Sequence, residues 1–172
     1  MFSVRSTMMI SEFSRLFTTF QRTAFRLELR SHYDVPSEEV EFARFVTGEK
    51  EPRQQNREWS ELVAKAVSLG KEMTRVRVLP EITTPYIQFE TQWCYPYSIR
   101  AGERIVFLQE TVLYSLIKEP IEDFWLFDDT VLVLMRYDSA GRFLGPEVRS
   151  SDVEVRAYRL LRDRLLACIE RE

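Results

Sequence analysis

Histidine is nearly absent from this chain, since His32 is the only one among 172 residues. That scarcity excludes a metal site with two histidines and a phosphotransfer pair of histidines. The two cysteines, Cys94 and Cys168, lie far apart without metal-ligand spacing, so we expect two reduced thiols. The five glycines never show the spacing of a phosphate-binding loop, which argues against NTPases and dinucleotide-dependent enzymes.

Long apolar runs and an excess of positive charge are also absent. No segment approaches the roughly 20 apolar residues of a membrane span, and the first residues lack the apolar stretch of a signal peptide. The formal net charge is −3 and the isoelectric point is about 5.4. We therefore predict a cytoplasmic protein that binds neither membranes nor nucleic acid directly.

The composition is that of an ordinary soluble domain, with 45% hydrophobic and 30% charged residues. The length fits a single domain over residues 1–172. Residues 1–8 carry no recognisable pattern, and we treat them as disordered or as upstream of a true start at Met8 or Met9.

Hydrophobic spacing along the chain predicts alternating helices and strands. Residues 9–20 have the spacing of an amphipathic helix that covers either its own domain or a neighbour. Residues 24–30, AFRLELR, alternate as a half-exposed strand. In TRVRVLP, residues 74–80, the valines face one way and the arginines the other. Residues 95–103 read as a turn, and Ser151 to Glu154 as a capping box that opens the last helix.

The segment FWLFDDTVLVLMRYDSAGRFLG, residues 124–145, predicts three strands joined by two turns. Together these patterns favour an α+β fold. We expect one mixed, mostly antiparallel sheet with a C-terminal three-strand meander, covered by about five helices.

The same segment places Asp123, Asp128 and Asp129 near one another in the sequence. Adjacent aspartates are common in tight turns because their side chains bond nearby backbone amides. A metal or acid–base site would need a further converging carboxylate, from Glu90, Asp123 or Asp138. We interpret the pair as turn residues and keep Asp128 and Asp129 as the only metal candidates.

Other catalytic patterns are missing. The sequence contains no H-E-x-x-H helix, EF-hand loop or G-x-S-x-G elbow, and no cysteine is paired with His32. We therefore predict a protein that is not an enzyme, with no catalytic residues and no cofactor.

The strongest binding feature is aromatic, because tyrosines and a tryptophan gather around one carboxylate between residues 86 and 97. Aromatic residues at helical spacing form a core, whereas polar-tipped tyrosines beside a carboxylate suit a ligand recess or a partner contact. The neighbouring strand arginines either pair with Glu90, which we favour, or bind an anion. The ligand- or partner-binding candidates are Arg75, Arg77, Tyr86, Glu90, Trp93, Tyr95 and Tyr97.

The order of several motifs resembles a known family. These motifs are FRLELR, WSELVAKAVSLGKEMTRVRVLP, YIQFETQWCYPYSIRAGERI, FWLFDDTVLVLMRYDSAGRFLG and RAYRLLRDRLL. They resemble an actinobacterial family of unknown function, domain of unknown function six-eight-seven-nine, over roughly residues 12–168. The resemblance implies a small single-domain protein, often encoded beside a helix-turn-helix regulator, for which no catalytic residues are established.

A weaker resemblance is to phospholipase D-like domains, some of which are inactive sensors in transcription regulators. It is carried by the order of a helix with AKAVSLGKEMTRVRVL, the FWLFDD strand, a meander and a last helix. Active members need an H-x-K-x-x-x-x-D motif. Here His32 is followed by Tyr33 and Asp34, without the lysine, so the resemblance implies a fold and not the hydrolase.

Three functions follow as hypotheses. The first is a regulatory interaction protein that acts with a helix-turn-helix regulator encoded nearby. The second is a small-ligand sensor with an inactive phospholipase D-like fold. The third is an enzyme that uses Asp128, Asp129 and a divalent metal. The sequence predicts no oligomeric state.

Overall fold

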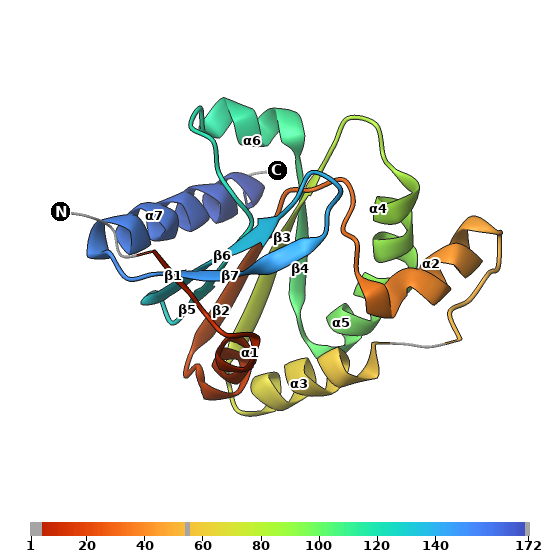
Figure 1. Cartoon of the computed structure of the whole chain (residues 1–172), viewed down its shortest axis with the longest axis horizontal. Coiled ribbons are helices and arrows are strands. Elements are labelled where there is room, and N and C mark those ends of the chain that lie inside the picture. Colours follow the sequence, from red (N-terminus) through yellow and green to blue (C-terminus); the bar gives the residue numbers. More distant parts are fainter. Residues whose placement is uncertain (1–4, 54–55, 171–172) are drawn as a thin grey trace.

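The computed structural model describes residues 5–53 and 56–170. One sheet organises these residues (Figure 1), with seven strands in the order β1-β7-β6-β5-β2-β3-β4. The strands are β1 Arg5–Thr7, β2 Thr23–Glu28, β3 Glu72–Leu79, β4 Arg104–Gln109, β5 Phe124–Phe127, β6 Val131–Tyr137 and β7 Phe143–Arg149. Residues 1–4 lie outside the described part. Residues 5–7 belong to the segment 1–8, which we expected to be disordered or upstream of the true start. They form β1 and pair with β7.

The sheet is mixed, as the sequence predicts. The strands β2, β3 and β4 run parallel to one another, whereas β5, β6 and β7 form the expected antiparallel meander, which joins β2 through β5. The α+β fold class is therefore confirmed.

The helices fill the connections between strands. They are α1 Ile10–Thr19, α2 Glu39–Val46, α3 Arg57–Ser68, α4 Pro85–Phe89, α5 Tyr95–Ala101, α6 Glu110–Leu116 and α7 Asp152–Ile169. A π-helical turn, Glu90–Cys94, joins α4 to α5, and a short 3₁₀ turn, Pro36–Glu38, precedes α2. Among the helices of the described residues, none combines the length and apolar character needed to cross a bilayer.

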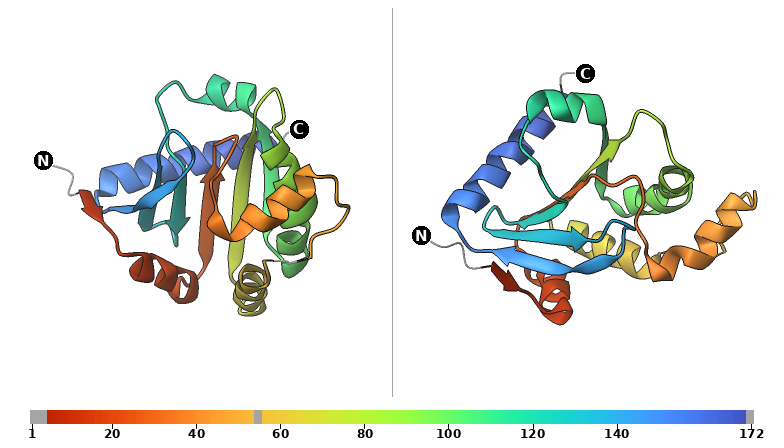
Figure 2. Two further views of the ribbon diagram at one scale, coloured as in Figure 1. Left: turned by 45° about the vertical axis from the view of Figure 1, so that its right-hand side comes forward. Right: turned by 45° about the horizontal axis from the view of Figure 1, so that its top comes forward.

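The two faces of the sheet differ in chemistry. One face is a continuous apolar core that α6 and α7 cover, and it includes Leu27, Val76, Phe124 and Leu165. On the other face, α1 and α3 cover a second apolar cluster around Trp125. The two views of Figure 2 agree that α7 and α3 lie on opposite sides of the sheet. The side chains of TRVRVLP therefore lie on the two faces as predicted, with the valines in the first core.

The first helix packs on its own domain. Phe17 lies edge-on against Trp59, Trp125 and Phe127, with ring centroids 4.8–5.4 Å apart. This arrangement answers the question that the sequence left open for residues 9–20.

Three local predictions are wrong. Residues 24–28 of β2 are buried on both faces rather than half-exposed, because helices cover the charged face as well. Residues 95–101 form α5 rather than a turn; Pro96 lies in its first turn, where its missing N–H is tolerated. The last helix does begin after Ser151, but the Ser151 side chain makes no capping hydrogen bond.

The acidic pair forms a turn, as predicted. Asp128 and Asp129 have φ angles of 51° and 63°, and the turn closes with the Thr130 N–H donating to the Phe127 carbonyl. Aspartate tolerates this left-handed conformation better than most residues. The Asp128 carboxylate accepts hydrogen bonds from three backbone amides, at Gln21, Arg22 and Thr23, at 2.7, 2.7 and 3.0 Å. Asp128 therefore fastens the end of β5 to the start of β2.

Replacing Asp128 should weaken that attachment. We expect Asp128→Ala to lower the free energy of unfolding by about 1.5–3 kcal/mol, because three amide donors lose a charged acceptor. Asp128→Asn should lose less, since its side-chain carbonyl still accepts and asparagine tolerates the turn. Urea denaturation measures both variants. Equal stability of wild type and Asp128→Ala would contradict this role.

Candidate functional site

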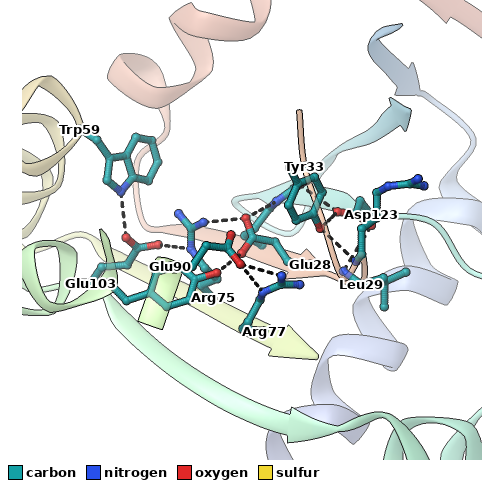
Figure 3. A network of polar contacts seen from close by, with 12 residues as sticks. Glu28, Leu29, Tyr33, Trp59, Arg75, Arg77, Glu90, Glu103 and Asp123 are labelled. Atoms are coloured by element: carbon teal, nitrogen blue, oxygen red, sulfur yellow. Dashed lines mark hydrogen bonds and ion pairs between the residues drawn. The ribbon is translucent and has the colours of Figure 1, made fainter. Parts of the chain in front are cut away.

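Charged side chains are buried together on the face of β2 and β3 that lies opposite α6 and α7. In the parallel register Arg26 lies beside Arg75, and Glu28 lies beside Arg77. Carboxylates from other elements surround them (Figure 3). The cluster comprises three arginines and four carboxylates: Arg26, Arg75, Arg77, Glu28, Glu90, Glu103 and Asp123.

Arg75 is held from four sides. Its Nε donates to Glu103 Oε1 at 2.8 Å, and its Nη1 donates to Glu28 Oε1 at 2.6 Å. The rings of Trp59 and Tyr95 flank the guanidinium, each centroid 5.6 Å from Cζ. The Trp59 indole also donates to Glu103 Oε2 at 2.9 Å, as Figure 3 shows. These contacts fix the orientation of the Arg75 side chain.

Arg26 makes the second connection, toward the meander. Its Nη2 donates to Asp123 Oδ2 and to the Tyr137 hydroxyl, both at 3.1 Å. The Tyr33 hydroxyl donates to the same Asp123 oxygen, and the Leu29 amide donates to the other at 3.3 Å. Asp123 thus fastens the end of β2 to the start of β5.

Arg77 is fully buried and pairs with Glu90, the ion pair that we favoured from the sequence. Its Nε and Nη2 donate to Glu90 Oε2 at 3.0 and 2.6 Å. Glu90 opens the π-helical turn, in which the Tyr95 amide donates to the Glu90 carbonyl. Such turns are frequent at functional sites. Arg75, by contrast, pairs with Glu28 and Glu103.

A pocket of about 270 Å³ opens above this cluster, beside Arg26 and Glu28 of β2 and Arg75 of β3. The polar and aromatic residues that line it include Arg26, Glu28, Tyr33, Glu38, Trp59, Ser60, Arg75, Tyr86, Glu90, Tyr95, Trp125 and Tyr137. The pocket therefore combines aromatic walls with a charged floor.

The seven candidates from the sequence divide among four environments. Four of them, Arg75, Tyr86, Glu90 and Tyr95, line the pocket. Arg77 lies buried beneath Glu90. Trp93 belongs to an aromatic core with Phe45 and Phe89. Tyr97 lies apart, against the guanidinium of Arg100 at 4.4 Å.

Burial and charge shift the carboxyl groups in different directions. Burial opposes ionisation of Glu28, but Arg75, Arg26 and Arg77 outweigh it and lower its pKa to about 2. Burial raises the pKa of Glu90 above its ordinary value although Arg77 opposes the rise. Burial likewise raises the pKa of Asp123, which Arg26 partly counteracts. The cluster therefore mixes one strongly acidic carboxyl with two that resist ionisation.

Glu28 should make folding sensitive to acid. Its folded pKa of about 2 lies below the ordinary 4.5, so it stabilises the fold above pH 4.5 and loses this effect as pH falls toward 2. The difference corresponds to about 3 kcal/mol. We expect Glu28→Gln to be less stable at pH 7 and to lose less stability across this window. Urea midpoints from pH 5 to pH 2.5 measure both effects.

The exposed Glu61→Gln is the control for Glu28→Gln, and it should follow the wild-type acid profile. A Glu28→Gln variant that lost stability as steeply as wild type would show that other groups carry the acid dependence.

The aspartates that were candidates for a metal or acid–base site do not converge on one point. Asp129 pairs with Arg162, and Asp128 accepts the three amides described above. Asp123 lies at the opposite end of β5, about 16 Å from Asp128 at about 3.3 Å per residue. Within residues 5–53 and 56–170, no group of His, Cys, Asp and Glu is placed to hold a metal ion. Burial raises the pKa of the Cys94 thiol, which disfavours the nucleophilic thiolate.

Comparison with family models places the chain. A model described as Domain of unknown function (DUF6879) matches residues 11–169, nearly the whole described fold. The chain belongs to this family. A search of curated proteins finds no match. Membership in DUF6879 assigns no activity, so the pocket has to be interpreted from its own chemistry.

For this DUF6879 member, sequence reasoning missed three of the seven residues of the charged cluster. The alternation of β2 predicts that Arg26 and Glu28 lie on the exposed side of a strand, and no pattern singles out Glu103. One signal was available: charged residues alternate with apolar ones on β2, at Arg26 and Glu28, and again on β3, at Arg75 and Arg77. If two such strands pair in one sheet, their charged side chains lie side by side on the same face. The strand pairing itself was not predictable from that pattern.

Proposed function

We propose that this DUF6879 domain binds a small molecule in the pocket above β2 and β3 and acts as a sensor. The observation that carries the proposal is the burial of three arginines and four carboxylates in one cluster, of which Arg26, Glu28, Arg75 and Glu90 line a pocket of about 270 Å³. Buried ion pairs contribute little net stability compared with apolar packing. Charged groups concentrated beside a concave surface are instead typical of binding sites.

The rigidity of the cluster supports binding without requiring catalysis. Each arginine is fixed by at least one carboxylate, and Arg75 is also clamped between two rings. Such preorganised groups bind a ligand at a lower entropic cost. The volume lies near the lower end of the range for small-molecule sites, which favours a small metabolite over a peptide.

The regulatory side of this proposal rests on analogy. The resemblance to inactive phospholipase D-like sensors supports it at the level of fold only. That the protein acts with a helix-turn-helix regulator encoded nearby stays a prediction. In that case, ligand binding would alter the contact between the domain and the regulator.

A filled-pocket variant tests the binding proposal. Ser60 lies on α3 at the pocket wall, whereas Ser68 is exposed at the end of the same helix. Wild type, Ser60→Trp and Ser68→Trp are incubated with the small-molecule fraction of a cell extract, washed and denatured, and the released compounds are identified by mass spectrometry. Circular dichroism checks that each variant folds.

We expect at least one compound to be released from wild type and from Ser68→Trp but not from Ser60→Trp, because the indole occupies the pocket. No retained compound, or equal retention by Ser60→Trp, would overturn the proposal.

A further inference from the structure

Two arginines at the pocket have donors left over. Arg26 lines the pocket and is only 3% exposed. Its Nη1 is buried and has no hydrogen-bond partner among the described residues. Nη2 of Arg75 likewise makes no hydrogen bond within residues 5–53 and 56–170. A guanidinium can only donate. Both groups therefore fit a ligand that supplies acceptor oxygens, such as a carboxylate or a phosphate.

The carboxyl groups of the cluster decide between these two acceptors, a carboxylate and a phosphate. Each of the three guanidinium groups already pairs with a carboxylate, and four carboxylates surround them. A phosphate dianion would bring two negative charges beside these carboxyl groups, of which Glu90 and Asp123 already resist ionisation. A carboxylate accompanied by a positive group adds no net charge. The ligand that fits both observations is overall neutral.

Glu38 supplies the place for the positive group. Its Oε2 accepts from the Tyr86 hydroxyl at 2.7 Å, and the side chain lines the pocket. Its other oxygen makes no hydrogen bond within the described part of the chain. Burial raises the pKa of Glu38, Glu28 raises it further, and Arg75 lowers it, so these groups are electrostatically coupled across the pocket. A ligand ammonium beside Glu38 would stabilise its charged form.

We infer that the ligand is a small zwitterion of the α-amino acid class, with its carboxylate at Arg75 and Arg26 and its ammonium at Glu38. This inference rests on the proposed binding function. The aromatic walls suit an apolar side chain, since Trp59, Tyr95 and Trp125 offer ring surface beside the arginines.

The test begins with a thermal-shift screen of the twenty standard L-amino acids and inorganic phosphate. The best amino acid is then compared by calorimetry with its decarboxylated amine and its deaminated acid. We expect one or more amino acids to raise Tm, and both analogues to bind at least about tenfold more weakly, because each lacks one of two charge-assisted contacts. Phosphate should not compete.

Charge variants locate the two contacts. Glu38→Gln should weaken the amino acid about tenfold and leave the deaminated acid unchanged, whereas the exposed neighbour Glu39→Gln should change neither. Arg75→Lys should weaken both the amino acid and the deaminated acid. If Arg75→Lys does not fold, the Glu38→Gln and Glu39→Gln pair decides the question.

Three results would overturn the ligand class: no amino acid binds, the deaminated acid binds as tightly as the amino acid, or Glu38→Gln has no effect. A different compound that is retained by wild type but not by Ser60→Trp would overturn the zwitterion while leaving the binding function intact. Absence of any retained compound would overturn both.

Discussion

Arg77→Met should lower the free energy of unfolding by about 3–5 kcal/mol at pH 8, since it leaves the buried Glu90 carboxylate without its counter-ion. Urea denaturation measures the loss. The cost should shrink at pH 5. Without Arg77 the folded pKa of Glu90 rises further, and a raised folded pKa favours the protonated, folded state at lower pH.

A double variant separates the charge effect from the packing effect. Arg77→Met with Glu90→Met removes both charges, and most of the lost stability should return. Arg104→Met is the surface control, because its pair with Glu170 is about half exposed on both sides, and it should cost at most about 1 kcal/mol. A double variant as unstable as Arg77→Met alone would mean that shape, and not the uncompensated charge, dominates.

Phe124→Ala should cost a similar 3–5 kcal/mol, by a different mechanism. Phe124 is fully buried in the apolar core opposite the pocket. Its ring lies 4.8 Å from that of Tyr158 on α7 and 5.6 Å from that of Phe25 on β2. Truncation therefore leaves a cavity where β5, β2 and α7 meet. Chemical denaturation measures the loss.

Phe143→Ala is the matched control for the core truncation. Phe143 is 37% exposed on β7, so its loss should cost about 1 kcal/mol. Phe124→Leu should also be milder than alanine, because it keeps more of the volume. Equal losses for Phe124→Ala and Phe143→Ala would contradict the assignment of Phe124 to the core that anchors α7.

The two cores affect function differently. The face that carries Phe124 holds the sheet to α7, whereas the face that carries Arg77 supports the pocket. We therefore expect Phe124→Ala, under conditions where it stays folded, to keep the ligand specificity of wild type. Changes in Arg75 and Glu38 should instead alter which ligands bind.

Much of this fold follows from local sequence. The valines and arginines of β3 alternate, which assigns them to opposite faces of any sheet. The aspartates at 128 and 129 predict a turn because few other residues accept a left-handed backbone. Regular apolar spacing marks the first helix and the last one. These features depend only on neighbouring residues, so they can be read without knowing the tertiary structure.

The charged pocket depends on tertiary structure instead. Alternation shows that Arg26 and Glu28 share a face, but it does not show that helices cover this face. The partners lie far away in sequence: Arg75 bonds Glu103 across 28 positions, and Arg26 bonds Asp123 across 97. Strand pairing and helix packing bring these groups together. Their burial then sets the direction of each pKa shift, because removing water makes every neighbouring charge count more strongly.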